Sequence, residues 1–356
     1  MKLAIALIAA LALAGCAGGG PAPAPTSGES PAASPAETAS VTPTREPGTE
    51  TPTASPDAQA SPSPDTAQLS VVATTTVLAD FVRKVAGDRA EVHALVPAGV
   101  DPHTFDPSPS DAVRVSEADL LVMNGLGLDE WVQPFIEQAG AGNVRLVELA
   151  EDLDGVDYLE GDDHHDEDEH GDDDEHHDED EDDHAYNPHL WMNVQYARLY
   201  VERLADELSA VDPANESDYR GNAAAYDGEL EELDGWIRGQ IGSLPEDDRR
   251  VISFHHAFPY FAEAYGMQIV GVLVEVPGRE PSAGEVAALI SAIRESGVRL
   301  ILAEAQFSDA LAQTLAAETE AEVVSTLYTD ALGDPPADTF AGAMRWNVEQ
   351  ILQALE

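Results

Sequence analysis

From residue 69 to residue 356, the chain alternates short runs rich in β-branched residues with helical patterns, and it does so in two halves. The strand-like runs are Ser70–Thr75, Glu91–Val96, Leu120–Asn124 and Val144–Glu148, then Arg250–Ser253, Gln268–Val272, Arg299–Ala303 and Glu322–Ser325. The clearest helical patterns between strand runs are Val77–Val85, Asp129–Gln138 and Val194–Leu208. Strands that alternate with helices build parallel sheets covered by helices on both faces. We therefore predict an α/β fold with two lobes, each a parallel sheet flanked by helices.

A long helical pattern connects the two halves. It covers Pro213–Ile241, with Asp212 placed to cap its first turn and Pro213 at the first helical position. At ~1.5 Å per residue this helix would be ~43 Å long, enough to join two lobes. The predicted boundaries are an N-terminal lobe at 69–211, a connecting helix at 212–243 and a C-terminal lobe at 244–356.

The N-terminal segment predicts export and lipidation. Met1-Lys2 precedes the apolar run Leu3–Leu13, which is shorter than the ~20 residues of a membrane span and fits a signal peptide. Leu13-Ala14-Gly15-Cys16 is typical of a bacterial lipoprotein cleavage site, so residues 1–15 would be removed and Cys16 lipidated. The alternative is a plain signal peptide that happens to contain a cysteine. Because Cys16 is the only cysteine, we expect neither an intrachain disulfide nor a thiolate metal site.

Residues 16–68 are mostly Pro, Ala, Ser, Thr and Glu, with almost no large apolar side chain. Such a segment cannot bury enough surface to offset chain entropy, so we expect a disordered stalk. A lipid on Cys16 and this stalk would tether the folded lobes to the outer side of the bacterial cell membrane.

Residues 161–184 form an acidic loop with sixteen carboxylates, six histidines and no basic residue. Its histidines are His164, His165, His170, His176, His177 and His184. Imidazole beside carboxylate favours divalent cations such as Zn²⁺, so we interpret this histidine-rich loop as a weak metal collector. The alternative is a solubilising acidic loop with incidental histidines. The formal net charge of −51 argues against nucleic acid as a partner, because nucleic acid requires a basic surface.

Four donors outside this loop lie near places where a ligand site is expected. Ligands of open α/β sheets bind beyond the carboxyl ends of the strands. His103 and His255 each follow such a strand end. His189 comes directly after the acidic loop, and Asp330 lies beyond the run that ends near Ser325. Three imidazoles and one carboxylate drawn from both lobes would form a tetrahedral shell around one cation.

Glu304 and His256 are candidates for supporting roles. Glu304 follows the strand Arg299–Ala303 directly, and we expect it to orient a ligand imidazole rather than to bind the ion. His256 is adjacent to His255, and neighbouring side chains at a helix start diverge. We therefore expect His256 behind the ligands or facing solvent.

Four short motifs surround these residues: Asp101-Pro102-His103, Asn187-Pro188-His189-Leu190-Trp191, His255-His256-Ala257-Phe258-Pro259-Tyr260-Phe261 and Glu304-Ala305-Gln306-Phe307-Ser308. Together they resemble the motifs of the metal-specific solute-binding lipoproteins of bacterial ABC importers, the ZnuA-like and TroA-like zinc-uptake family. The resemblance covers residues 70–356 and implies that His103, His189, His255 and Asp330 take the family's four ligand positions. The histidine-rich loop is typical of the zinc branch, whereas Asn187 stands where the family often has Asp. The implied partners are an ABC permease and its ATPase, and we expect a monomer.

The ligand chemistry favours zinc. Nitrogen-rich sites hold Zn²⁺ better than Mn²⁺, which prefers oxygen donors, so a histidine at position 255 favours Zn²⁺. We predict extracytoplasmic capture of Zn²⁺ and delivery to an importer, without enzymatic activity; the alternative cargo is Mn²⁺ or another divalent ion. A zinc hydrolase with Glu304 as general base is less favoured. Catalytic zinc keeps one position open for water, whereas four protein ligands would close the shell. A metal-dependent adhesin or metal buffer would share the same anchor and site.

Overall fold

The computed structural model describes residues 68–139, 144–161, 186–274, 281–306, 310–319 and 321–356. Cys16, the stalk up to residue 67 and the six histidines of the histidine-rich loop lie outside these ranges. Within the described residues, no helix combines the length and the apolar character needed to cross a membrane.

The N-terminal lobe is built on a four-stranded parallel sheet in the order β2-β1-β3-β4. Its elements are β1 (Leu69–Ala73), α1 (Thr76–Ala86), β2 (Ala90–Ala94), α2 (Pro109–Ser116), β3 (Leu120–Met123), α3 (Val132–Ala139) and β4 (Arg145–Glu148). β3 is buried along its whole length, which explains why its sequence is a continuous apolar run. All four strands overlap the segments predicted from the sequence.

Successive residues of β1 and β3 point to opposite faces of the N-terminal sheet. Val71 and Val122 belong to an apolar cluster that includes α1 and the later helices α4 (Val194–Val211) and α5 (Glu216–Gly242). Leu121, on the other face, packs in a separate cluster with Val115 of α2 and Val132 of α3. Helices therefore cover both faces of the sheet, as the strand and helix alternation predicts.

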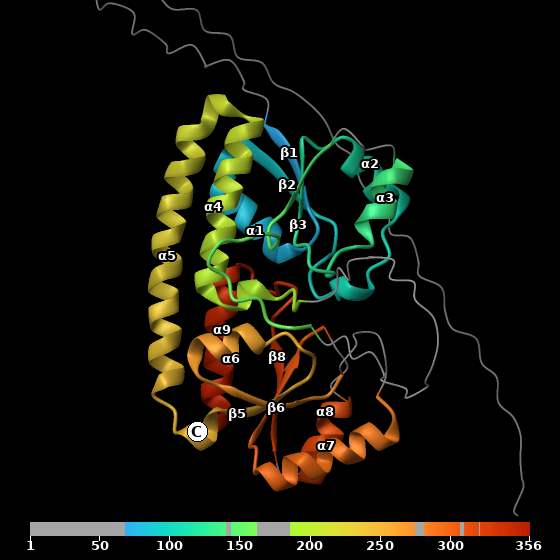
Figure 1. The fold of residues 1–356 in the computed structure, drawn as a ribbon, viewed down its shortest axis with the longest axis vertical. Helices are drawn as coiled ribbons and strands as arrows, with labels where there is room; N and C mark the ends of the chain where they lie inside the picture. The colour runs from blue at the N-terminus through green and yellow to red at the C-terminus, as the bar shows by residue number, and fades with distance from the viewer. Residues whose placement is uncertain (1–67, 140–143, 162–185, 275–280, 307–309, 320) are drawn as a thin grey trace, which may run out of the picture. The chain divides into compact units, whose positions relative to one another are not determined.

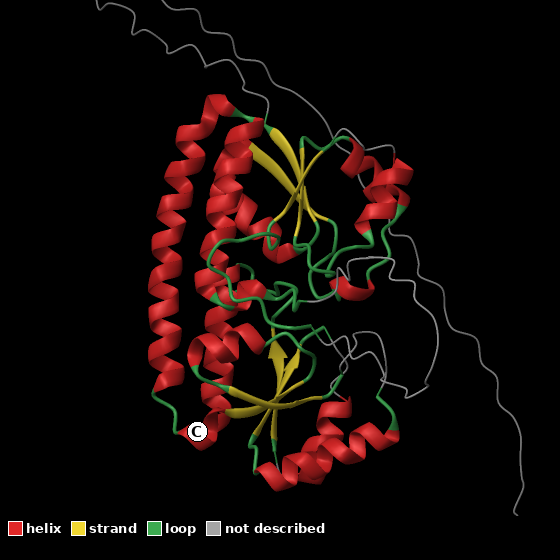
Figure 2. Ribbon diagram, viewed as in Figure 1, coloured by secondary structure: helices red, strands yellow, loops and turns green. Residues whose placement is uncertain are grey.

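The C-terminal lobe repeats this plan with a parallel sheet in the order β6-β5-β7-β8. Its elements are β5 (Arg250–Ser253), α6 (Pro259–Tyr265), β6 (Gln268–Val272), α7 (Ala283–Ser296), β7 (Leu300–Glu304), α8 (Ala310–Thr319), β8 (Glu322–Leu327) and α9 (Phe340–Leu355). One face packs with α6 and α9, and the other with α7 and α8. Figure 2 shows the strands of each lobe as a separate sheet, with loops gathered between the two sheets.

α5 is the long connecting helix, and it runs beside both lobes (Figure 1), contacting α1 on one side and α6 and α9 on the other. The prediction placed its start at Pro213, but Pro213–Asn215 forms a 3-10 turn and the α-helix begins at Glu216. Its buried side chains, such as Tyr219 and Ile237, join one apolar cluster that extends through both lobes. The predicted fold class is confirmed.

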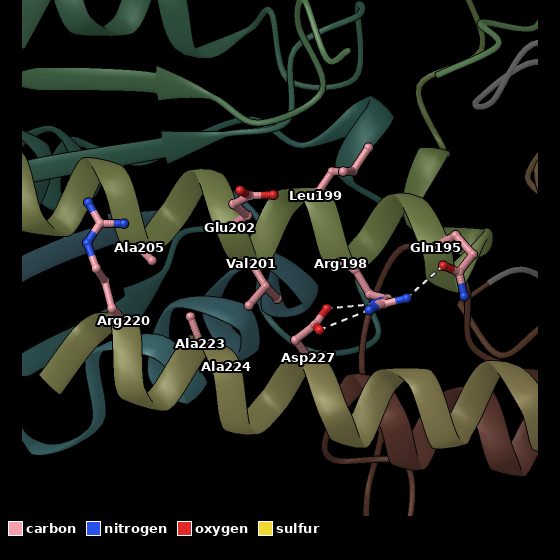
Figure 3. Close-up of a pocket in the computed structure, with 10 residues that line it drawn as sticks. All are labelled: Gln195, Arg198, Leu199, Val201, Glu202, Ala205, Arg220, Ala223, Ala224 and Asp227. Carbon is pink, nitrogen blue, oxygen red and sulfur yellow. Dashed lines mark hydrogen bonds and ion pairs between the residues drawn. The ribbon is translucent and has the colours of Figure 1, made fainter. Parts of the chain in front are cut away.

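α4 and α5 pack along each other and enclose a groove of about 470 Å³ between them. Figure 3 shows that Arg198 crosses this groove, donating from Nε and Nη2 to the two carboxylate oxygens of Asp227 at 2.6 and 2.9 Å. The same guanidinium donates to Gln195 at 2.8 Å. The two bonds to Asp227 tie the connecting helix to the N-terminal lobe.

Candidate metal centre

His103 lies on a short 3-10 turn after β2, and the turn is fixed from two directions. The carboxylate of Asp101 accepts from the His103 backbone N–H at 3.0 Å and from the Thr104 hydroxyl at 2.9 Å, which caps the turn. The Trp131 indole donates to the Pro102 carbonyl at 2.9 Å. Pro102 at the first position of the turn fixes the local backbone, so the imidazole of His103 has a defined direction.

His189 follows Pro188 and precedes another 3-10 turn, and its backbone is held by a buried amide. Asn124 donates from Nδ2 to the Pro188 carbonyl at 3.0 Å, and the Tyr200 hydroxyl donates to Asn124 Oδ1 at 2.8 Å. The Oδ1 atom of Asn187 accepts from the His189 backbone N–H at 3.0 Å and lies 3.0 Å from His189 Nδ1. The Nε2 atom of His189 therefore faces away from Asn187.

His255 follows β5, two residues beyond its last residue, Ser253. Its Nδ1 atom lies 2.9 Å from Oε1 of Glu304, the last residue of the neighbouring strand β7. The Ser253 hydroxyl donates to the His255 carbonyl. Glu304 lies behind the His255 ring and outside the group of four donors, as the last residue of the strand and not after it.

Asp330 follows β8 and lies between two imidazoles. Its Oδ1 atom is 3.2 Å from His189 Nε2, and its Oδ2 atom is 3.1 Å from His255 Nε2. Gln306 donates from Nε2 to Asp330 Oδ2 at 3.2 Å. Trp191 donates from Nε1 to the carbonyl of Thr329 at 2.9 Å, which fixes the backbone just before the carboxylate.

The four predicted donors lie close together in the structure. Each of His103, His189, His255 and Asp330 offers one ligand atom, and these four atoms all lie within 4.8 Å of one another. His103 Nε2 and His189 Nε2 are 3.3 Å apart. The edge of a tetrahedron with metal–ligand bonds of about 2.0–2.1 Å is about 3.3–3.4 Å. Three donor pairs lie near this value, at 3.3 Å for His103–His189, 3.2 Å for His189–Asp330 and 3.1 Å for His255–Asp330. The arrangement can hold one small divalent cation by four donors.

Burial and charge differ between the two sides of this group. Burial lowers the pKa of His103 to about 3 against the opposing effect of Asp330, and burial also lowers the pKa of His189. Burial alone would lower the pKa of His255, but Glu304 and Asp330 raise it well above the usual value. Burial would raise the pKa of Asp330, yet His255 and His189 hold it well below the usual value. The N-terminal lobe thus presents neutral imidazoles, which is the form that binds metals.

Several supporting residues were not predicted from the sequence. Asn124 and Tyr200 hold the backbone before His189, and Gln306 donates to the Asp330 carboxylate; only Gln306 lies in one of the four motifs. His256, a predicted supporting residue, is half-buried and outside the group of four donors, while its carbonyl accepts from Asn187. The six histidines predicted to collect metal weakly lie outside the described residues.

The comparisons with known proteins agree with this architecture. A profile of the family described as zinc-uptake complex component A, periplasmic, matches residues 71–354. The manganese-binding lipoprotein MntA of Halalkalibacterium halodurans is 30% identical over 295 residues, which cover 82% of this chain and 90% of that protein. The manganese ABC transporter substrate-binding lipoprotein PsaA of Streptococcus pneumoniae is 28% identical over 290 residues, covering 81% and 89%.

Solved structures show the same fold. The periplasmic zinc-binding protein TroA from Treponema pallidum superposes with a TM-score of 0.71 at 24% identity, covering 81% of this chain and 99% of that one. The manganese-bound periplasmic metal-binding protein from Candidatus Liberibacter asiaticus superposes with a TM-score of 0.66 at 25% identity, covering 81% and 100%.

Proposed function

This chain belongs to the zinc-uptake component A family and is a metal-binding, substrate-binding protein of an ABC importer, and from that premise we propose that its cargo is Zn²⁺. Members of this family are periplasmic metal-binding transport proteins and not enzymes, so the hydrolase alternative is set aside. Its relatives are lipoproteins of importers, which makes an ABC permease and its ATPase the partners.

The single observation that supports the site is the convergence of His103, His189, His255 and Asp330 from four loops in two lobes. We propose that these residues are the ligands of the transported ion. The supporting residue Glu304 bonds to Nδ1 of His255, which leaves Nε2 of that ring toward the ion.

The donor set favours Zn²⁺ over Mn²⁺. Three nitrogen donors and one carboxylate suit zinc, whereas manganese prefers a shell richer in oxygen. Mn²⁺ is the second candidate because MntA and PsaA, two of the similar proteins, are named as manganese-binding. A chelator-buffered competition measures both affinities, and metal accumulation in cells starved of either ion identifies the physiological cargo. Restoration of growth only under manganese starvation would contradict zinc as the cargo.

The ligand assignment is tested by replacing each of the three histidines with Ala in the full mature chain. A chelator that keeps free zinc very low limits the readout to the tight site. Each variant should lose more affinity than the about 10–100-fold cost of changing an outer partner of a metal ligand. His93→Ala is the matched control, because His93 is an exposed histidine of β2 outside the group. If all three variants kept the parental zinc affinity, the assignment would be wrong.

The segments outside the described residues have proposed roles as well. We propose that the histidine-rich loop collects zinc weakly near the site. Deleting residues 161–184 should then lower the number of bound zinc ions while changing the tightest dissociation constant less than about tenfold, or ~1.4 kcal/mol. Loss of the tight site on deletion would show that the loop supplies ligands.

We also propose that Cys16 carries the lipid that holds the protein at the membrane, with residues 16–68 as the stalk. The substitution Cys16→Ser should release the protein into the soluble fraction or leave it unprocessed. Unchanged incorporation of a lipid probe would exclude Cys16 as the lipidation site. An adhesin or a metal buffer would act without a permease. ATP-dependent zinc uptake by the reconstituted permease in the presence of this protein would therefore favour transport over both alternatives.

A further inference from the structure

Asn187 is a buried residue between the two lobes, and its side chain makes contacts in both directions. It is only 2% exposed. Its Nδ2 atom donates to the carbonyl of His256 in the C-terminal lobe at 2.7 Å. Its Oδ1 atom accepts from the His189 backbone N–H at 3.0 Å and lies 3.0 Å from Nδ1 of the same imidazole. One amide thus contacts the chain at His189 and the carbonyl next to His255.

These partners fix the orientation of the Asn187 amide. A backbone carbonyl can only accept a hydrogen bond, and a backbone N–H can only donate one. The NH₂ group of Asn187 must therefore face His256, and its oxygen must face His189. A flipped amide would lose both backbone hydrogen bonds, so the oxygen cannot exchange with the nitrogen.

The fixed oxygen determines which ring nitrogen of His189 carries the proton. An amide oxygen only accepts, so the Nδ1 atom facing Asn187 must be the protonated nitrogen of the neutral ring. The lone pair then belongs to Nε2, which lies 3.3 Å from His103 Nε2 and 3.2 Å from Asp330 Oδ1. The nitrogen that faces the other donors is the one free to bind a cation.

We propose that Asn187 is a positioning residue that sets the tautomer and direction of the His189 imidazole and ties this ring to the C-terminal lobe. A carboxylate could accept the hydrogen bond from His189 Nδ1–H but could not donate one to the His256 carbonyl. An amide does both. The Tyr260 hydroxyl of α6 supports it by donating to the Asn187 carbonyl at 3.1 Å. The proposal rests on the proposed role of His189 as a ligand.

The tautomer can be read in the metal-free protein. Histidine-selective ¹⁵N labelling of the full mature chain gives long-range proton–nitrogen correlations, and a His189→Gln spectrum identifies the His189 signals by their absence. The parent should show the Nδ1-protonated ring. Asn187→Ala should shift the signal toward the Nε2-protonated ring, and Asn187→Asp, which keeps an acceptor, should retain the proton on Nδ1. An unchanged tautomer in Asn187→Ala would overturn the proposal.

Metal affinity gives the second readout. Asn187→Ala should bind zinc about 10–100-fold more weakly than the parent, the usual cost of losing a partner behind a metal ligand. Asn187→Asp should lie between Asn187→Ala and the parent, because it restores the acceptor but not the donor to His256. An Asp variant no tighter than the Ala variant would contradict the role of the acceptor.

The control is Asn222→Ala. Asn222 also donates from Nδ2 to a backbone carbonyl, that of Val85, at 3.0 Å, but it lies between α5 and α1 and should leave zinc affinity unchanged. Two variants separate the ligand role of His189 from the positioning role of Asn187. If His189→Gln keeps parental affinity, the proposed ligand set fails. If His189→Gln loses zinc while Asn187→Ala keeps both tautomer and affinity, only the role of Asn187 fails.

Discussion

The two lobes contact each other in two places. We call the first the helix seam, where α1 packs against the start of α9. We call the second the donor seam, which surrounds His103, His189, His255 and Asp330. At the helix seam, the rings of Phe81 and Phe340 pack edge to face with centroids 4.7 Å apart. The Phe340 backbone N–H donates to Asp80 at 2.8 Å. The Leu332 N–H donates to the Thr76 hydroxyl at the same distance.

The donor seam is held by polar contacts instead. Trp191 donates to the Thr329 carbonyl and Asn187 donates to the His256 carbonyl, each from one lobe to the other. The helix seam belongs to the apolar cluster that extends through both lobes, so it stabilises the pairing of the lobes without an ion. The donor seam would gain further stability from the cation that we propose binds there. The difference indicates that the lobes are aligned before the ion arrives.

The largest effect is expected from Phe340→Ala at the helix seam. Phe340 is 2% exposed, and removing a buried phenyl ring costs about 3–5 kcal/mol of unfolding free energy. Because the cluster is shared, both lobes should become less stable together in a denaturant titration of the metal-free protein. Val113→Ala, at a residue 54% exposed on α2, is the control with little effect. Separate unfolding of one lobe in the Phe340 variant would contradict a shared core.

The next largest effect concerns the ion at the donor seam. Free zinc at 100 times the dissociation constant should raise the unfolding free energy of the parent by about 2.7 kcal/mol through mass action. His103→Ala should lose this increment, and its metal-free protein should unfold much like the parent, because His103 is the least buried of the four donors. Thermal unfolding with and without zinc measures both. A zinc increment that survives in His103→Ala would place the ion elsewhere.

A smaller effect is expected from Tyr260→Phe, which removes one hydroxyl that contacts Asn187 at the donor seam. This hydroxyl donates to the Asn187 carbonyl at 3.1 Å and accepts from the Leu159 N–H at 3.0 Å. Its loss should cost about 0.5–1.5 kcal/mol of stability and weaken zinc binding modestly. Tyr196→Phe, which loses a bond to the exposed Asp157 N–H, should leave zinc affinity unchanged. Equal zinc affinity in both variants would show that the Tyr260 hydroxyl at the donor seam does not influence zinc binding.

The smallest expected effect is a change in how the free energy of unfolding depends on pH, and it comes from Asp80 at the helix seam. Burial raises the pKa of Asp80 above its usual value of 3.8, against the hydrogen bond from the Phe340 N–H. The folded state therefore holds this proton to higher pH than the unfolded chain does. The resulting stability is present below the unfolded pKa and is lost as pH rises through the folded pKa.

Asp80→Asn tests this sign, because the amide is neutral at every pH and can still accept from Phe340. The stability of the variant relative to the parent should increase from acidic to neutral pH, by at most about 1.4 kcal/mol per unit of raised pKa. Denaturant unfolding of the metal-free proteins at several pH values measures the slope. A relative stability that falls with pH would mean that the carboxylate, not the acid, is the favoured form.

The sequence predicted both sheets because buried parallel strands have a distinctive composition. β3 is apolar and buried at every residue, and β7 is apolar and buried up to its last residue, Glu304, so both runs are easily recognised. The α-helix α5 starts three residues after Pro213, because Pro213–Asn215 forms a 3-10 turn, and a proline at the first position is compatible with either kind of turn.

The meeting of the four donors could be expected from local signals, because each follows a strand or a recognisable motif. The contacts between the lobes could not. The Asp80–Phe340 bond joins residues 260 apart in the chain, and its partners carry no local pattern. The role of Asn187 had one sequence signal, since an amide stands where the family often has Asp. The sequence does not show that the amide has an acceptor in the other lobe, the His256 carbonyl, to which it donates a hydrogen bond.

The uneven burial of the four donors has a consequence for exchange kinetics. His189, His255 and Asp330 are each no more than 2% exposed, whereas His103 is only partly buried. An arriving hydrated cation would exchange its water molecules for ligands one after another. The last water would be replaced by His103, on the side that solvent still reaches. Departure would reverse this path, with the bond to His103 the first to be replaced by water. A permease that pulled on the loop of His103 would therefore accelerate release without unfolding either lobe.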